Sequence, residues 1–433
     1  METAKVAVIG FGTIGSGTAK ILLEAKDRLA QKAGKRIELA YVCDKDLTRE
    51  RNVKVPADLL TSNLDDVLND PDVEVAVELI GGLEPARTIV LQLLERGKNV
   101  VTANKALLAE HGAELFAKAR EVGRSIAFEA AVAGGIPIIA GIGECLVANE
   151  IQSIHAILNG TSNFILSQME EKGQEYAAAV AEAQRRGYAE ANPAMDVDGT
   201  DAAQKLAILA QLAFGATVDW KTIPRTGIET VTASDMQYAR ELGYSIKLLA
   251  VGERTGDGLE LHVSPTLVRC GTPLAEVRGA YNAVRVVGDA VGRVFFHGLG
   301  AGQMPTASAV VSDIVDTVVG RTAITFNTLR LWDDSRVCDV APRDPDSVTS
   351  RFYLRFQVQD CPGVLAEIAG ILGKHKISIA SVIQHEAEDE AEGVVPLVIM
   401  THAAPEGPMR DAMAQIENLA VVRPGSVRFR VRD

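Results

Sequence analysis

Short apolar runs alternate with amphipathic stretches along the N-terminal part of the chain. The apolar runs begin near Lys5, Arg36, Val73 and Asn99, and each is followed by a segment with apolar residues at helical spacing. This pattern predicts buried strands separated by helices. Such an alternation gives a parallel sheet covered by helices, with ligands at the C-terminal ends of the strands. We therefore expect residues 1–133 to form a doubly wound α/β domain.

Three glycines follow the first predicted strand, in "KVAVIGFGTIGSG". Gly10 permits a tight turn, Gly12 lets the backbone approach a pyrophosphate, and Gly15 lets the helix pack closely on the strand. The start of the helix offers N–H groups and a positive dipole end to phosphates. At this place in a βαβ pattern the motif indicates a Rossmann-type dinucleotide site rather than a plain glycine-rich turn. The residues that we expect to contact the cofactor are Gly10, Phe11, Gly12, Thr13, Ile14 and Gly15.

The end of the second predicted strand bears on the choice of cofactor. An acid at this place binds ribose hydroxyls and favours NAD, and Asp44 is the candidate. Asp44 lies further from the glycines than the usual ~20 residues. Its neighbour Lys45 is suited to a 2′-phosphate, which would favour NADP. The sequence therefore leaves NAD and NADP both open.

Lys105 follows a strand in "VVTANKALLA". Asn104 is a candidate helix N-cap, which places Lys105 in the first helical turn. A cation there opposes the helix dipole. The residue is therefore either a solvated lysine or a functional cation that points into the cofactor cleft from the end of a strand.

One lysine stands in an otherwise apolar helical stretch in the middle of the chain. From residue 202 to residue 218, Lys205 is the only ionisable side chain. Asp201 lies one helical turn before it, on the same face. Gln204 and Gln211 are expected to mark the more polar side of the helix.

The segment before this helix is acidic. Its carboxylates are Glu190, Asp196, Asp198 and Asp201. A buried, unpaired ammonium costs several kcal/mol or loses its proton, so the lysine requires partners. The group is either a structural ion pair or a catalytic acid/base pair. Burial lowers the pKa of a lysine and nearby carboxylates raise it, so the sequence does not decide between the two.

Six motifs, in this order, resemble the homoserine dehydrogenase family over roughly residues 4–320. They are "GFGTIG", "VVTANKALLA", "EAAVAGGIP", "LNGTSNFIL", "GYAEANPAMDVDGTDAAQKLAILA" and "GLGAGQMPTASAVVSD". The resemblance implies NAD(P)-dependent interconversion of L-homoserine and L-aspartate 4-semialdehyde, a step in threonine, methionine and isoleucine biosynthesis. It also implies an α+β substrate-binding and dimerisation domain over residues 134–302. A helix over residues 303–320 is expected to complete the nucleotide domain.

The resemblance implies roles for the charged residues. The lysine that matches Lys205 donates a proton to the aldehyde oxygen, and the one that matches Lys105 helps to bind substrate or cofactor. Glu190 is implied to bind the substrate through its ammonium group. Asp196 and Asp201 hold the substrate and the lysine in place. The division of proton transfer between Lys105 and Lys205 stays open.

Two further expectations rest on the resemblance alone. A structural sodium ion is implied on main-chain carbonyls of "EAAVAGGIP", at Glu129, Val132, Gly134 and Ile136. Main-chain oxygens suit a hard cation. Gly302, in the glycine loop before a helix, is implied to contact the cofactor. The alternative interpretation of this loop is an interdomain hinge.

The segment "CDVAPRDPDSVTS" is polar and contains two prolines, so we expect residues 321–350 to form a linker. Residues 351–433 follow as strand, helix, two strands, helix and strand, a ferredoxin-like order. This tail resembles an ACT domain, with Asp360, Pro362 and Gly363 at its first turn. The acidic run 386–392 is expected to be a solvated hairpin tip.

The ACT resemblance implies regulation. Such domains bind amino acids at paired interfaces, and we expect threonine as a feedback effector. We also expect a homodimer or homotetramer, and a tail that folds separately from the catalytic core.

Charge and cysteine content limit the other possibilities. The formal net charge of −13 argues against a nucleic-acid partner, and we find no signal peptide or membrane span. Scattered cysteines without metal-ligand spacing predict reduced thiols in a cytoplasmic protein. They are Cys43, Cys145, Cys270, Cys338 and Cys361. Two alternative functions remain open. One is an oxidoreductase that acts on another amino-acid aldehyde, and the other is an inactive amino-acid sensor. A sensor would not need Lys105 and Lys205.

Overall fold

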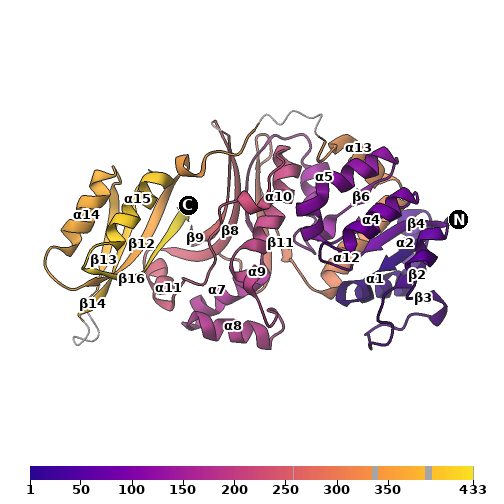
Figure 1. Cartoon of the computed structure of the whole chain (residues 1–433), viewed down its shortest axis with the longest axis horizontal. Coiled ribbons are helices and arrows are strands. Elements are labelled where there is room, and N and C mark those ends of the chain that lie inside the picture. Colours follow the sequence, from indigo (N-terminus) through magenta and orange to yellow (C-terminus); the bar gives the residue numbers. More distant parts are fainter. Residues whose placement is uncertain (257, 334–339, 386–392, 433) are drawn as a thin grey trace. The chain divides into compact units, whose positions relative to one another are not determined.

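The computed structural model describes residues 1–256, 258–333, 340–385 and 393–432, which form two compact units (Figure 1). The first unit is built from Met1–Ile154, Ala203–Thr222 and Asn282–Val340. The second is built from His155–Ala202, Ile223–Tyr281 and Ala341–Asp433. Residues 134–302, which we expected to be one domain, thus contribute to both units.

The first unit contains a six-stranded parallel sheet in the order β3-β2-β1-β4-β5-β6. Its strands are β1 (Thr3–Ile9), β2 (Arg36–Cys43), β3 (Leu60–Thr61), β4 (Val73–Glu78), β5 (Asn99–Thr102) and β6 (Ile126–Ala127). The helices between them are α1 (Thr13–Glu24), α2 (Lys26–Ala33), α3 (Leu64–Asn69), α4 (Ala86–Glu95) and α5 (Lys105–Glu121). Val6, Val8, Val75 and Val77 are buried, because helices cover a parallel sheet on both faces. This strand order confirms the predicted Rossmann-type fold.

A helix from late in the sequence also packs in this unit. Helix α12 (Gln303–Val318) lies against α1, where a side chain at Gly17 would clash with Gln303 and Ala307. The side-chain amide of Gln303 donates to the hydroxyl of Ser16 at 2.9 Å. Val310 belongs to the same hydrophobic core as strand β1. Helix α12 is therefore an integral part of the nucleotide domain.

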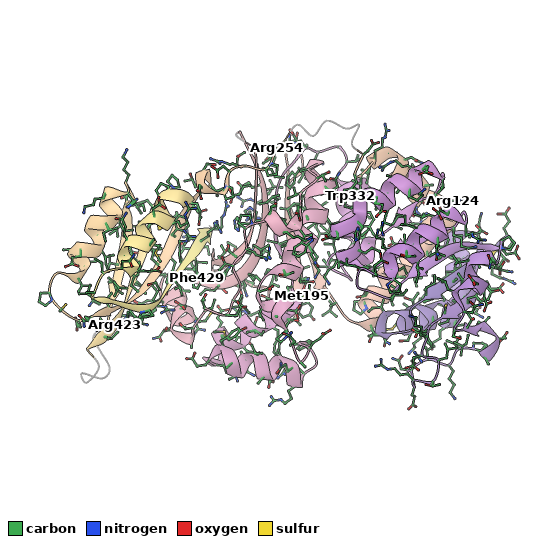
Figure 2. The ribbon with its side chains drawn as sticks, in the orientation of Figure 1. Arg124, Met195, Arg254, Trp332, Arg423 and Phe429 are labelled. Atoms are coloured by element: carbon green, nitrogen blue, oxygen red, sulfur yellow. The ribbon has the colours of Figure 1, made fainter. Side chains whose placement is uncertain are left out.

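The range that we expected to be a linker is partly folded. Helix α13 (Arg321–Leu329) buries Phe326, which stacks on Phe116 of α5 with 5.2 Å between ring centroids. Trp332 (Figure 2) is also buried, and its ring centroid lies 4.6 Å from that of Phe116. The prediction of a linker is therefore wrong for residues 321–333, because their aromatic side chains complete the core beside α5. Cys338 lies outside the described residues.

The first unit also contains η2 (Glu129–Ala131), α6 (Ile138–Ala140), η3 (Gly141–Cys145), η4 (Trp220–Thr222), β10 (Tyr281–Gly288) and β11 (Gly292–Leu299). Helix α10 (Thr200–Phe214) begins in the second unit and continues in the first.

The second unit is built around an antiparallel hairpin of two long strands, β8 (Tyr244–Thr255) and β9 (Gly258–Arg269). Its strands follow the order β7-β8-β9-β16-β12-β14-β13, where β7 is Ile151–Ile157. The helices before the tail are α7 (Gly160–Lys172), α8 (Tyr176–Arg185), α9 (Ala194–Val197) and α11 (Ala233–Glu241).

The tail has the predicted β-α-β-β-α-β order. Its elements are β12 (Thr349–Gln359), α14 (Val364–Lys374), β13 (Ile379–Gln384), β14 (Val394–Thr401), α15 (Glu406–Glu417) and β16 (Val422–Arg432), with the short η5 (Pro345–Ser347) and β15 (Ala404–Pro405). Phe352, Phe356, Ile368 and Met409 form part of its own core. The ferredoxin-like prediction is confirmed, while the acidic run 386–392 lies outside the described residues.

The tail also shares interactions with the rest of the second unit. Strand β16 pairs in parallel with β9, with Arg430 opposite Thr266. Asp235, in the first turn of α11, is fully buried and accepts hydrogen bonds from Arg355 (Nε, 2.6 Å; Nη2, 3.1 Å) and Tyr353 (Oη, 2.9 Å). The tail thus supplies the partner of β9 and the cation that neutralises Asp235, and its separate folding stays a prediction.

We predict that Arg355→Met destabilises the fold strongly, because it leaves the Asp235 carboxylate buried without its cation. Breaking a buried pair from one side costs about 3–5 kcal/mol. Chemical unfolding followed by circular dichroism measures the loss. The control is Arg321→Met, which breaks the exposed pair with Asp316 and should cost less than about 1 kcal/mol. Equal stability of the two variants would contradict a role of the tail in the fold.

Candidate active site

The glycine loop after β1 has the geometry of a phosphate-binding turn. Gly10 has φ +98°, and a Cβ there would lie 2.6 Å from the backbone of Leu79. A Cβ on Gly15 would lie 1.9 Å from the carbonyl oxygen of Gly10, whereas a Cβ on Gly12 would meet open space. Gly10 and Gly15 are therefore required by the fold, and the open side of Gly12 lies where a pyrophosphate would approach the start of α1.

Polar groups gather beside this loop at the end of β2. The Asp44 carboxylate accepts hydrogen bonds from the backbone N–H groups of Phe11 (2.5 Å) and Asp46 (2.9 Å). Lys45 is exposed. Arg51 lies over the Phe11 ring at 4.5 Å and donates from Nε to the Phe11 carbonyl at 2.6 Å. Sequence reasoning missed Arg51, because the irregular loop that carries it has no motif.

Lys105 is the first residue of α5, as predicted. Asn104 caps the helix by accepting from the N–H of Leu107 at 3.1 Å, and Lys105 is partly buried. The turn before it is anchored on Glu78, a fully buried carboxylate at the end of β4 that accepts from the Thr102 hydroxyl at 2.7 Å. Glu78 also accepts from the N–H groups of residues 80 and 81, so it fixes the loop next to the glycine turn. Sequence reasoning missed Glu78, whose signal is an acid at the end of an apolar strand.

In the structure, Asp196 and Asp201 are hydrogen-bonded to the same side chain, that of Asn159. The amide nitrogen of Asn159 donates to Asp196 at 2.8 Å and to Asp201 at 2.9 Å. The Asn159 carbonyl oxygen accepts from the N–H of Ser162 at 2.8 Å and so caps α7. Sequence reasoning quoted the motif that contains Asn159 but did not assign it to the site. Its signal is the N-cap position directly after a strand.

Helix α10 is more deeply buried than predicted. Of residues 201–210, every one is buried except Lys205, which is partly exposed. Gln204 and Gln211 are 5 % and 6 % exposed, so the expectation that they mark a polar side is wrong. Lys205 is therefore the position at which this stretch of the helix opens to solvent, one turn after Asp201.

Two other predicted residues lie in loops. Glu190 is exposed between α8 and α9, and its main-chain carbonyl accepts from the Gln184 amide at 3.2 Å. Gly302 is the N-cap of α12, with φ +125°. The role of Glu190 in substrate binding stays a prediction.

The segment predicted to hold sodium is an irregular turn after β6. Glu129 is buried, which raises the pKa of its carboxyl, and its two oxygens accept from the N–H groups of Ile139 and Ala140 at 2.8 Å each. Its own N–H donates to Asp313 at 2.8 Å. Ala133 and Gly134 have positive φ. The sodium site stays a prediction, and the described residues contain no group of three or more His, Cys, Asp or Glu side chains that could hold a metal ion.

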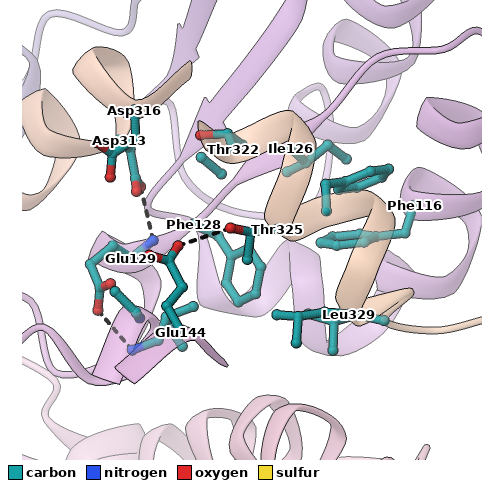
Figure 3. A pocket seen from close by; sticks show the side chains of 15 residues that line it. Phe116, Ile126, Phe128, Glu129, Glu144, Asp313, Asp316, Thr322, Thr325 and Leu329 are labelled. Atoms are coloured by element: carbon teal, nitrogen blue, oxygen red, sulfur yellow. Dashed lines mark hydrogen bonds between the residues drawn. The ribbon is translucent and has the colours of Figure 1, made fainter. Parts of the chain in front are cut away.

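A small cavity of about 70 Å³ lies beside Glu129 (Figure 3). The acids Glu144, Asp313 and Asp316 line it together with the rings of Phe116 and Phe128. Burial, and after it the neighbouring Glu129, raise the pKa of Asp313 well above its usual range. The cavity belongs to the packing of α12 and α13.

Among the described residues, no helix has the length and apolar character of a membrane span.

Comparisons with known proteins identify the family of the chain. Family models match "Homoserine dehydrogenase, NAD binding domain" over residues 10–129, "Homoserine dehydrogenase" over residues 137–315 and "ACT domain" over residues 352–421. The fold and the glycine loop define an oxidoreductase with an NAD(P)-binding domain. The chain belongs to the homoserine dehydrogenase family.

Individual relatives cover the whole chain. The homoserine dehydrogenase of Pseudomonas aeruginosa is 46% identical over 100% of both chains, and that of Bacillus subtilis is 38% identical over 100% of this chain and 99% of its own. The crystal structure of a homoserine dehydrogenase from Thiobacillus denitrificans matches with a TM-score of 0.91 and 42% identity, over 100% of this chain and 99% of its own. A hyperthermophilic archaeal homoserine dehydrogenase in complex with NADPH matches with a TM-score of 0.60 and 26% identity, over 73% of this chain and 97% of its own.

We predict that Gly12→Ala weakens cofactor binding about tenfold or more without loss of stability. The added methyl group enters the open space in which charge-assisted hydrogen bonds to the pyrophosphate form, and such bonds contribute roughly 1.5–3 kcal/mol. Cofactor titration and thermal unfolding measure the two effects. Gly15→Ala is the matched contrast, because its methyl group would clash with the Gly10 carbonyl and lower the unfolding temperature. Unchanged cofactor affinity in Gly12→Ala would contradict the proposed phosphate position.

Proposed function

We propose that Lys205 transfers the proton in the interconversion of L-homoserine and L-aspartate 4-semialdehyde. The observation that supports this role is the burial of residues 201–210 at every position except Lys205. The nicotinamide cofactor supplies or accepts the hydride at C4. In homoserine oxidation the neutral Lys205 amine takes the proton of the C4 hydroxyl, and in the reverse direction the ammonium returns it to the aldehyde oxygen.

The acidic residues are proposed to bind the amino-acid part of the substrate. Asp196 and Asp201 are held in a fixed geometry by Asn159, and Asp201 lies one turn before Lys205. Glu190 is exposed, so its carboxylate is available for the substrate ammonium group. Lys105 is proposed to bind substrate or cofactor near the start of α5. These roles follow the family resemblance.

We predict that Lys205→Ala lowers kcat by ~10²–10⁴, the usual contribution of a general acid/base. Lys205→Arg should lose nearly as much, because a guanidinium keeps the charge but does not release a proton. Initial rates of nicotinamide absorbance measure kcat, and cofactor titration should give an unchanged Kd. The matched control is Lys172→Ala, an exposed lysine at the end of α7. A near-normal kcat of Lys205→Arg would contradict proton transfer by Lys205 and leave this residue an electrostatic role only.

The cofactor is proposed to be NADP(H) in preference to NAD(H). Asp44 already accepts two backbone hydrogen bonds, and the loop after it carries the cations Lys45, Arg49 and Arg51. A 2′-phosphate requires cations at this place. The archaeal relative in complex with NADPH is consistent with this choice.

We predict that Lys45→Glu lowers kcat/KM for NADPH about tenfold or more and changes kcat/KM for NADH little. Only the 2′-phosphate would meet the reversed charge, and a charge-assisted hydrogen bond contributes roughly 1.5–3 kcal/mol. Steady-state kinetics with each cofactor give the ratio. The control is Lys54→Glu, an exposed lysine further along the same loop. An unchanged NADPH/NADH ratio in Lys45→Glu would contradict the preference.

Three further properties are proposed from the resemblance. A sodium ion bound by main-chain carbonyls at Glu129, Val132, Gly134 and Ile136 would fix the turn after β6. The protein is proposed to form a homodimer or homotetramer. It is proposed to lie in the cytoplasm, which is consistent with the unpaired state of the described cysteines Cys43, Cys145, Cys270 and Cys361. Threonine is proposed as the feedback effector, supported by the match to the ACT domain.

A further inference from the structure

Glu78, at the end of β4, is a carboxylate that is 0 % exposed and lacks a cationic partner among the described residues. Its Oε1 accepts from the N–H groups of Ile80 (2.8 Å) and Gly81 (3.1 Å). Its Oε2 accepts from the Thr102 hydroxyl at 2.7 Å. Buried charges in proteins are normally paired with an opposite charge or bound to a metal. The neutral groups around Glu78 hold its carboxylate in place but supply no opposite charge.

The hydrogen bonds around Glu78 are those of an ionised carboxylate. An ionised carboxylate only accepts hydrogen bonds, whereas a protonated carboxyl group also donates one. The Thr102 hydroxyl oxygen accepts from the N–H of Asn104 at 3.0 Å, so its own proton is donated to Glu78. All three groups that surround the carboxylate are therefore donors. The site at the end of β4 carries a fixed negative charge.

Glu78 lies at the edge of the sheet where dinucleotides bind. The strand order β3-β2-β1-β4-β5-β6 reverses between β1 and β4, and dinucleotides bind at the carboxyl ends of the strands at such a switch point. Leu79, the next residue, donates to the Ile9 carbonyl at 2.8 Å and lies against the turn at Gly10. The acid after the second strand binds the adenosine ribose in this fold. The nicotinamide half of the cofactor therefore extends to the other side of the glycine turn, toward the ends of β4 and β5.

The loop that holds the Glu78 carboxylate is open on its outer side. Ile80, Gly81 and Gly82 are exposed, and a Cβ on either glycine would meet open space. The side-chain amide of Asn104 donates to the Gly82 carbonyl at 2.7 Å, which fixes the loop to the start of α5. A fixed backbone without side chains leaves room for a planar ring to approach the loop. The charge of Glu78, held by N–H groups of the same loop, acts on a ring that binds there.

We propose that Glu78 supplies the negative charge that offsets the positive charge of the oxidised nicotinamide ring. This ring is cationic in NAD⁺ and NADP⁺ and neutral in NADH and NADPH, so the carboxylate attracts only the oxidised form. A buried charge acts more strongly on a bound cation than an exposed charge does, because less water lies between them. Glu78 thus selectively strengthens the binding of the oxidised cofactor. The inference goes beyond the proposed roles of Lys205 and Lys105, and it holds for either cofactor because both carry the same ring.

The experiment is calorimetric titration of the full-length enzyme with NADP⁺ and with NADPH, in the absence of substrate. Glu78→Gln keeps the size of the side chain and removes its charge. The glutamine oxygen can accept from the N–H groups of the loop while its NH2 group donates to the Thr102 hydroxyl oxygen, so we expect the variant to fold. We expect the Kd of NADP⁺ to rise about tenfold and that of NADPH to stay nearly unchanged. The fragment 2′-phospho-ADP-ribose, which lacks the ring, should bind equally to both proteins.

The control variants separate the charge of Glu78 from its hydrogen bonds. Glu74→Gln removes an exposed acid from the same strand and should leave both Kd values unchanged. Thr102→Val removes a neutral donor and keeps the charge, so any loss of affinity should be equal for NADP⁺ and NADPH. Glu78→Ala is a second variant without the charge, and it should change the ratio of the two Kd values in the same direction as Glu78→Gln.

Thermal unfolding without cofactor verifies that each variant is folded. Equal weakening of NADP⁺ and NADPH in the two Glu78 variants would reduce Glu78 to a structural role and overturn the inference. Unchanged affinity for both forms would overturn it as well. A matching loss of affinity for 2′-phospho-ADP-ribose would show that the change acts outside the nicotinamide ring, with the same consequence.

Discussion

The carboxamide of Asn159 fixes the geometry on which the candidate active site depends. One amide nitrogen donates to both Asp196 and Asp201, while the amide oxygen caps α7 through Ser162. Two carboxylates that meet at one group repel each other, so a shared neutral donor lowers the cost of holding both ionised. Because Asp201 belongs to the first turn of α10, the same hydrogen bonds fix the start of the helix that carries Lys205.

The tail is integrated into the second unit by charged as well as apolar contacts. Arg432 of β16 pairs with Glu253 and Glu260, and hydrogen bonding by His155 together with the Arg432 charge lowers the pKa of Glu253 to about 2. Ion pairs of this kind are costly to break from one side only. The tail therefore contributes to the stability of β8 and β9 as well as to the proposed regulation.

Local patterns predicted much of the fold. The three glycines follow from the φ angles that a tight turn requires. The Asn104 cap follows from the unpaired N–H groups at the start of a helix. The order of elements in the tail follows from the period of its hydrophobic residues. The prediction failed where a residue's environment comes from distant segments. Gln204 and Gln211 are polar by type, yet packing around α10 buries them. Phe326 and Trp332 lie in a range that looked like a linker, and they gain a core from α5.

By itself, the sequence determined the alternation of strands and helices, the dinucleotide loop, the isolation of Lys205 and the resemblance to one enzyme family. These features depend on residue type and on spacing of a few positions, which the chain carries wherever it folds. The tertiary structure alone decided that Asn159 joins two aspartates, that Asp235 receives Arg355, and that Ile228 donates to the Val197 carbonyl beside the acidic loop. Each of these contacts joins segments far apart in the chain, and no local period or propensity encodes which buried carboxylate meets which donor.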